Sequence, residues 1–210
     1  MQRVKIWDSF VRISHWLMVV LVALMWFTAE EGYMDWHLRL AGVLGALIIT
    51  RILWGFWGSE SARFSRFVKG PSAVMHHLRE LKQGEYQPSN THNAAGGVAV
   101  VLLLLLLAAQ FTTGLLASDD IFYSGPLASA VGSDISGAAT DIHELLFNVL
   151  LAVIIVHVIA IIWYRIKGIQ LIAAMFHGYR NNVSAPRLVS GLVGIIAAAV
   201  IAAALFYWIN

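Results

Sequence analysis

Long apolar stretches separated by short charged segments dominate the chain. Five of them are long and apolar enough to cross a bilayer as helices, which takes about 20 residues each. They are residues 11–29, 37–57, 97–117, 142–164 and 188–209. No small-residue cleavage site follows the first stretch, so we interpret it as a retained helix rather than a signal peptide. The pattern predicts an all-α membrane protein with five transmembrane helices.

Two further segments have helical spacing with one apolar side. Residues 71–84 lie between the second and third stretches, and residues 169–177 lie between the fourth and fifth. Both are too short to span a bilayer, and we expect them to form short interfacial helices at the membrane surface.

Composition narrows the possible chemistry. Charged residues make up 12% of the 210 residues and mean hydropathy is +0.73, whereas soluble domains carry about 25% charged residues. The chain contains no cysteine, which excludes disulfides, thiolate nucleophiles, iron–sulfur clusters and covalently attached c-type haem. A net charge of +2 gives no indication of nucleic-acid binding. Membrane lipid is the expected partner of most of the surface.

Charge predicts how the helices are oriented. Lys and Arg gather before or at the start of the first stretch, between the second and third, and between the fourth and fifth, apart from Arg39 and Arg51 inside the second. Segments 29–36 and 118–141 contain no Lys or Arg. Their acidic residues are Glu30, Glu31, Asp35, Asp119, Asp120, Asp134 and Asp141. By the positive-inside rule we expect a cytoplasmic N-terminus and two acidic loops that face outward.

Four histidines lie inside or at the mouths of the predicted helices: His15, His37, His143 and His157. Ionisable groups are costly there and are functional candidates by default, although a neutral histidine can also simply bond a neighbouring helix. His143 and His157 are 14 residues apart, about 21 Å along one helix and nearly on one face. The expected topology therefore places His37 with His143 in an outer layer and His15 with His157 in an inner layer.

Two imidazoles in each layer match a six-coordinate haem, because the porphyrin already supplies four nitrogens. Zinc takes three or four protein ligands, and neither layer offers a third suitable residue. A proton relay would need carboxylates between the histidines. Glu144 is the only Asp or Glu within the apolar stretches that contain these histidines. We therefore expect one noncovalent haem b in each layer.

Three more residues are candidates for cofactor contacts. Arg51 follows His37 by 14 residues, which predicts a place one layer inward, where it either binds a propionate of the inner haem or snorkels to lipid headgroups. Arg39 has the same two alternatives at the outer haem. His92 precedes the third helix and either contacts a propionate or quinone headgroup or is an interfacial histidine.

Several of these motifs together resemble the bacterial cytochrome b561 family, nearest to the branch of b-type cytochrome subunits of nickel–iron hydrogenases. The motifs are WDSFVRISHW in the first helix, a His followed by an Arg 14 residues later in the second, HNAAGG at the third, and HELLFNVLLAVIIVHV in the fourth. The resemblance implies that His15, His37, His143 and His157 are axial ligands of two haems b. It covers about residues 4–180, so we expect a di-haem domain over 1–180 and an additional transmembrane helix over 181–210.

Three functions are compatible with these features. The favoured one is a cytochrome of the bacterial inner membrane that passes electrons between the quinone pool and a periplasmic partner, such as a c-type cytochrome or a dehydrogenase. A superoxide:quinone oxidoreductase is the second, although it needs a cationic funnel and the outer segments lack Lys and Arg. The third is a non-redox membrane protein whose histidines only pack helices, and transport is a further alternative.

Overall fold

The computed structural model describes residues 3–85, 89–119 and 121–209. Asp120, one of the acidic residues predicted to face outward, lies outside the described residues. The cytoplasmic or outward orientation of each segment remains a prediction.

The chain divides into two compact units, each built from three separate stretches of sequence. Unit 1 comprises Met1–Ser14, Arg51–Leu102 and His157–Ile195. Unit 2 comprises His15–Thr50, Leu103–Val156 and Ile196–Asn210.

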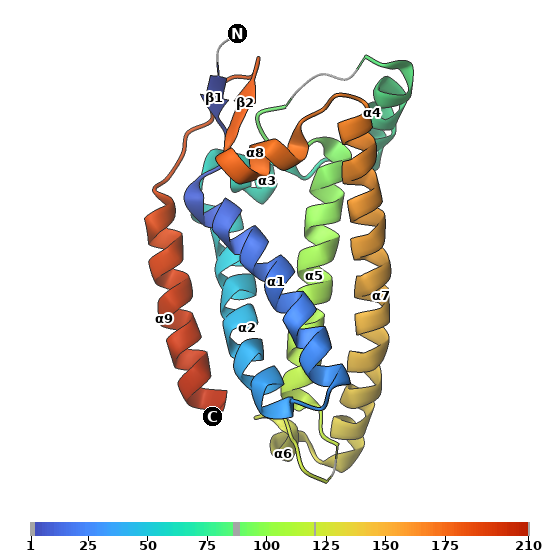
Figure 1. The fold of residues 1–210 in the computed structure, drawn as a ribbon, viewed down its shortest axis with the longest axis vertical. Helices are drawn as coiled ribbons and strands as arrows, with labels where there is room; N and C mark the ends of the chain where they lie inside the picture. Colours follow the sequence, from blue (N-terminus) through green and yellow to red (C-terminus); the bar gives the residue numbers. More distant parts are fainter. Residues whose placement is uncertain (1–2, 86–88, 120, 210) are drawn as a thin grey trace. The chain divides into compact units, whose positions relative to one another are not determined.

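Within residues 3–85, 89–119 and 121–209, five helices are long and apolar enough to cross a membrane (Figure 1), as the hydropathy pattern predicts. They are α1 (Ser9–Glu30), α2 (Met34–Trp57), α5 (Ala94–Leu116), α7 (Ser133–Ile166) and α9 (Gly191–Ile209). The prediction of an all-α, multi-pass membrane protein is confirmed. α7 begins at Ser133 rather than near residue 142, because a polar N-terminal turn that includes Asp134 extends the apolar span, and acidic residues stabilise a helix N-terminus.

Shorter elements connect the long helices. Both predicted surface helices are present, as α4 (Pro71–Gln83) and α8 (Leu171–His177). α4 begins with a proline at its first position and ends at Gly84, whose φ of 80° is the left-handed conformation that closes a helix. The remaining short helices are η1 (Glu60–Ala62), α3 (Phe64–Phe67) and α6 (Ala128–Val131).

A two-stranded sheet in unit 1 joins the start of the chain to the segment after α8 (Figure 1). Strand β1 (Arg3–Lys5) pairs antiparallel with β2 (Tyr179–Asn181), with Val4 opposite Arg180. The backbone N–H of Ile6 extends this pairing by donating to the carbonyl of Gly178 at 2.8 Å. The sheet thus fixes the residues that lead into α1.

Asp8 organises the core of unit 1. Its Oδ1 accepts the Val11 N–H at 2.9 Å and caps α1, and its Oδ2 accepts the indole N–H of Trp54 at 3.1 Å. The carboxyl group is buried, and both of its oxygens are used. A buried carboxylate with charge-neutral donors on both oxygens holds the N-terminus of α1 against α2.

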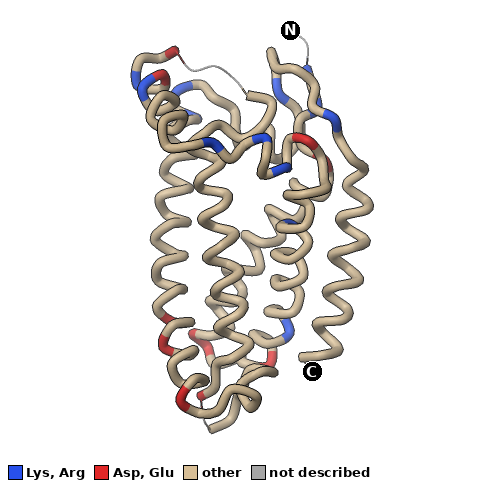
Figure 2. The backbone as a smooth tube through the Cα atoms, turned by 180° about the vertical axis from the view of Figure 1, so that it is seen from behind, with Lys and Arg blue, Asp and Glu red and all other residues tan. Residues whose placement is uncertain are grey.

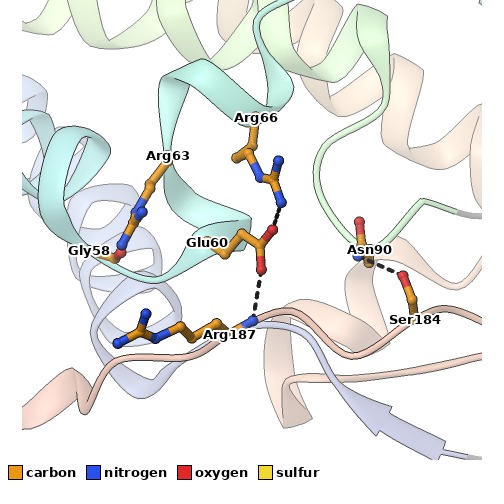
Figure 3. A network of polar contacts seen from close by, with 7 residues as sticks. All are labelled: Gly58, Glu60, Arg63, Arg66, Asn90, Ser184 and Arg187. Carbon is orange, nitrogen blue, oxygen red and sulfur yellow. Dashed lines mark hydrogen bonds and ion pairs between the residues drawn. The ribbon is translucent and has the colours of Figure 1, made fainter.

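Glu60 forms the centre of a second polar network in unit 1 (Figure 3). It pairs with Arg66, and its Oε2 accepts the backbone N–H of Arg187 at 2.9 Å. The Glu60 N–H in turn donates to the Arg187 carbonyl at 2.9 Å. Because Glu60 bonds both the N–H and the carbonyl of Arg187, the segment before α9 is fastened to η1.

Close approach of helices shapes the core of unit 2. A Cβ on Gly45 of α2 would lie 2.4 Å from the Phe111 ring of α5, so a side chain there would displace the ring. Gly42 lies one turn earlier and faces α9, where the nearest atom, on Ile209, would be 3.4 Å from such a Cβ. These two glycines allow neighbouring helices to pack closely, a common role of small residues in membrane helices.

The two units differ in charge. Thirteen of the 14 Lys and Arg residues belong to unit 1, whereas eight of the 12 Asp and Glu residues belong to unit 2. Figure 2 shows acidic positions in the loops and helices of unit 2, whose sequence contains Arg39 as its single Lys or Arg residue.

Candidate functional site: a pair of histidines with fixed tautomers

His37 lies in the first turn of α2, against the C-terminal end of α1 in unit 2. Its Nδ1 lies 3.0 Å from the backbone carbonyl of Met25 and 3.3 Å from the hydroxyl oxygen of Thr28. A carbonyl oxygen can only accept, so Nδ1 must carry the proton. The lone pair of the neutral ring is therefore on Nε2, the arrangement that metal-bound histidines use.

His143 in α7 has the same arrangement with a different partner. Its Nδ1 lies 3.1 Å from the hydroxyl oxygen of Thr113 in α5. The Thr113 hydroxyl donates its own proton to backbone carbonyls of its helix, that of Ala109 at 2.9 Å and that of Gln110 at 3.1 Å. The oxygen is thus left to accept from the imidazole, and Nε2 of His143 also keeps its lone pair.

The structure brings these two imidazoles together. The ring centres of His37 and His143 are 6.5 Å apart, with an angle of 73° between the planes. With metal–nitrogen bonds of about 2 Å and about 1 Å from nitrogen to ring centre, two imidazoles on opposite sides of one iron have centres about 6 Å apart. The spacing and donor chemistry of the pair fit a bis-histidine haem.

Among the described residues, no three His, Asp or Glu side chains gather closely enough to hold a metal ion. A pair of histidines is too few for a structural zinc site, which takes four protein ligands. The porphyrin of a haem supplies the four remaining nitrogens, so two protein ligands are sufficient.

Sequence reasoning missed the groups on α5 that position His143. Thr113 holds its Nδ1, and Gly114 makes room for the ring, because a Cβ there would lie 2.9 Å from the imidazole Cε1. Gln110 lies one turn earlier on α5, and its Oε1 is buried with no hydrogen-bond partner in the described part of the chain. Polar residues with a glycine at three- and four-residue spacing in an apolar helix were the available signal.

Arg51 is buried in unit 1, with 5% of its surface exposed. Its guanidinium carbon lies 5.9 Å from the centre of the Phe64 ring, and its Nη1 is buried without a hydrogen-bond partner among the described residues. The buried carboxylate of Asp8 interacts electrostatically with Arg51, but Nη1 has no hydrogen-bond acceptor in the described part of the chain, so an anionic ligand would complete its bonding. Snorkelling to headgroups, the alternative, would leave the side chain exposed.

Arg39 differs from Arg51 in its surroundings. Its side chain is exposed, and its guanidinium carbon lies 5.4 Å from the centre of the Trp36 indole, one turn away on α2. A cation on an interfacial tryptophan is typical of a headgroup contact. Of its two predicted alternatives, lipid phosphate has the better structural support.

His92 precedes α5 in unit 1 and packs between two aromatic rings. Its centre lies 4.7 Å from that of Trp7 and 4.6 Å from that of Phe67. Its neighbour Asn93 caps α5 by accepting the Gly96 N–H at 2.7 Å, and His92 and Asn93 both line a polar cavity of about 490 Å³. Both predicted roles of His92, a cofactor contact and an interfacial position, stay predictions.

His15 and His157 belong to different units, so their pairing stays a prediction. His15 lies in unit 2 with its ring 5.0 Å from Trp16 and nearly perpendicular to it. His157 lies in unit 1, partly buried in the cytoplasmic half predicted for α7.

Comparison with known families identifies the chain. The family model of prokaryotic cytochrome b561 matches residues 6–178, which include all four helix histidines, Arg39, Arg51 and His92. Comparisons with curated proteins and with solved structures found no match. The matched region covers most of the sequence and agrees with the resemblance that the histidine motifs carry. The chain therefore belongs to the prokaryotic cytochrome b561 family.

Proposed function

We propose that the protein is a di-haem b-type cytochrome that passes electrons across the inner membrane between the quinone pool and a periplasmic redox partner. Family membership supports membrane electron transfer with b-type haem. The observation that carries the finer proposal is the His37–His143 pair, with ring centres 6.5 Å apart and both Nδ1 atoms engaged. Bound haem iron would supply reversible one-electron chemistry.

In this proposal His37 and His143 hold the outer haem, and His15 and His157 hold the inner one. Met25, Thr28 and Thr113 keep the outer imidazoles in the tautomer that presents Nε2. Arg51 neutralises a propionate of the inner haem, which its unpartnered Nη1 supports. Arg39 then serves the membrane interface rather than the haem.

The charge difference between the units supports the proposed orientation. Unit 1 holds nearly all the Lys and Arg residues and is assigned to the cytoplasmic side, with the N-terminus, by the positive-inside rule. In this proposal the acidic segments 29–36 and 118–141 face the periplasm. The polar cavity beside His92 is our candidate for the place where a quinone headgroup exchanges electrons and protons with the cytoplasmic side.

The test uses the purified protein in lipid vesicles. A short-chain quinol is added, and the α-band absorbance of the haem reports its reduction. We expect complete haem reduction, followed by reoxidation when an oxidised soluble c-type cytochrome is added on the face bearing the acidic segments. Haem that the quinol leaves oxidised would contradict the quinone link. Reduction by superoxide but not by quinol would favour the superoxide:quinone oxidoreductase instead.

A further inference from the structure

Residues 118, 119 and 121–124 of unit 2 form a hydrogen-bonded turn with an apolar tip. Oδ1 of Asp119 accepts three backbone N–H groups, from Tyr123 at 2.8 Å, Phe122 at 2.9 Å and Ile121 at 3.0 Å. The Asp119 N–H donates to the Tyr123 carbonyl at 3.1 Å, and the hydroxyls of Ser118 and Ser124 lie 2.8 Å apart. These bonds close the turn without help from its two apolar side chains.

The tip is nevertheless exposed. Ile121 has 76% and Phe122 has 83% of its surface accessible, although neither belongs to a membrane-spanning helix. Large apolar side chains that are exposed outside the membrane spans indicate an interaction site. Because the turn is already fixed, a partner would spend little conformational entropy in binding it.

The base of the loop is fastened beside a predicted haem ligand. The Thr140 hydroxyl donates to the Ser118 carbonyl at 2.9 Å, and its oxygen accepts the Ser118 N–H at 3.1 Å. Thr140 precedes His143 by three residues, a rise of about 4.5 Å along α7. The base of this loop is therefore fastened less than one helical turn from His143.

Charge selects between the possible occupants. Segment 118–141 has no Lys or Arg, and it contains Asp119 just before the tip and Asp134 and Asp141 after it. The three backbone N–H donors, from Tyr123 first, hold the pKa of Asp119 below its ordinary value, so this carboxylate is charged at neutral pH. Acidic residues repel anionic lipid headgroups, which interfacial anchors usually meet with Lys or Arg. The same residues attract a basic protein.

We propose that Ile121 and Phe122 form the docking tip for a soluble, basic redox protein, with the surrounding carboxylates attracting it electrostatically. This inference rests on the proposed function, which assigns segment 118–141 to the periplasm and requires an electron-transfer partner there. It adds which residues the partner binds and what charge the partner carries.

The first test measures binding directly, so it does not depend on electron transfer. Mitochondrial cytochrome c, a small basic haem protein, is the probe, and its succinylated form, with lysine charges reversed, is the matched probe. We expect saturable binding of the basic form to the protein in lipid nanodiscs, weakening as salt rises, and none of the succinylated form. Equal binding of both forms, or no binding at low ionic strength, overturns the proposal.

Variants then locate the contact. Replacing both Ile121→Ser and Phe122→Ser should weaken binding at least tenfold. Ile166→Ser, at an equally exposed isoleucine in unit 1, is the control and should leave binding unchanged. Asp119→Asn keeps the Oδ1 acceptor and should weaken binding less, with a smaller salt dependence. An unchanged affinity of the double variant refutes the assignment. Haem content is measured on the same samples, so a protein without haem that still binds the probe contradicts only the proposed function.

A label at the tip separates a protein partner from lipid. The chain has no cysteine, so Phe122→Cys carries a single environment-sensitive fluorophore. We expect its emission to change when the basic probe is added and to be insensitive to brominated lipid in the nanodisc. Quenching by brominated lipid without any response to the probe would make the tip a membrane anchor and overturn the proposal.

Discussion

The two units satisfy their buried polar groups in different ways. In unit 1 the buried carboxylate of Asp8 uses both oxygens, accepting the Val11 backbone N–H and the Trp54 indole N–H. In unit 2 the paired imidazoles each use one nitrogen in a protein hydrogen bond and retain the other. Saturated groups stabilise a fold, whereas a fixed and unsaturated donor atom is ready to bind a ligand. A fixed imidazole with one nitrogen left over therefore indicates a ligand-binding site more specifically than the presence of a histidine does.

Arg51 is the exception within unit 1. It is buried like Asp8, but its Nη1 lacks the partner that each Asp8 oxygen has. By the same criterion it marks a ligand-binding position.

The largest expected effect is the loss of one haem. His37→Ala and His143→Ala should each remove the same spectral component, because a bis-histidine site needs both ligands. The double variant should lose no more haem than either single variant. His77→Ala is the matched control, since His77 is buried but its Nε2 already contacts the Tyr164 hydroxyl at 2.8 Å. Different components lost in the two single variants would break the pairing.

The threonines should have unequal effects. Thr113→Val removes the hydroxyl that lies 3.1 Å from His143 Nδ1 and leaves the contact of His143 with the Gln110 backbone, whereas after Thr28→Val the Met25 carbonyl still holds His37 at 3.0 Å. Loss of such a supporting partner typically costs about 10- to 100-fold in metal affinity. We therefore expect Thr113→Val to release haem to apomyoglobin at least tenfold more readily than wild type, with a smaller change for Thr28→Val. Equal effects would mean that the carbonyl contributes little.

Substitutions of Arg51 in unit 1 and Arg39 in unit 2 should have different effects on the haem midpoint potentials. A nearby positive charge favours the reduced haem, so Arg51→Gln should lower one midpoint potential by about 60 mV, a tenfold change for one electron. The other potential should stay nearly constant. Arg39→Gln is the exposed counterpart and should change neither. A redox titration followed at the α-band decides this, and two unchanged potentials after Arg51→Gln would assign Arg51 to lipid.

The smallest effect concerns stability in unit 1. The Tyr164 hydroxyl contacts His77 and accepts from Asn93 at 3.1 Å, so Tyr164→Phe should lower the free energy of unfolding by about 1 kcal/mol.

Burial lowers the pKa of His77, so this imidazole takes up a proton at a higher pH in the unfolded chain than in the folded protein. Stability should therefore fall as pH drops through the ordinary histidine range near 6.5. Thermal unfolding in detergent between pH 5 and 8 measures it. His77→Gln should flatten the dependence, and an unchanged profile would contradict this role.

Much of the fold could be predicted from the sequence because bilayer-spanning helices are recognised by length and hydropathy. All five spans, α4 and α8 were expected, and each is present. The β1–β2 pair was missed, since three-residue strands at opposite ends of the matched region have no local pattern of their own. The polar start of α7 was missed because it lies outside the apolar run.

The site was predicted in part. Spacing and topology pointed to His37 and His143 as one pair, and their rings lie together. Thr28 and Thr113 were missed because a threonine in an apolar helix usually bonds its own backbone, as both also do here. Which threonine reaches an imidazole depends on packing between helices, and sequence periodicity does not contain that information.

Haem stoichiometry tests the central claim most directly. Acid–acetone extraction and the pyridine haemochrome assay count noncovalent haem b per chain in the wild type and in the His37→Ala/His143→Ala double variant. The account predicts two haems in the wild type and one in the variant. A wild type with one haem, or a variant that keeps two, would contradict it.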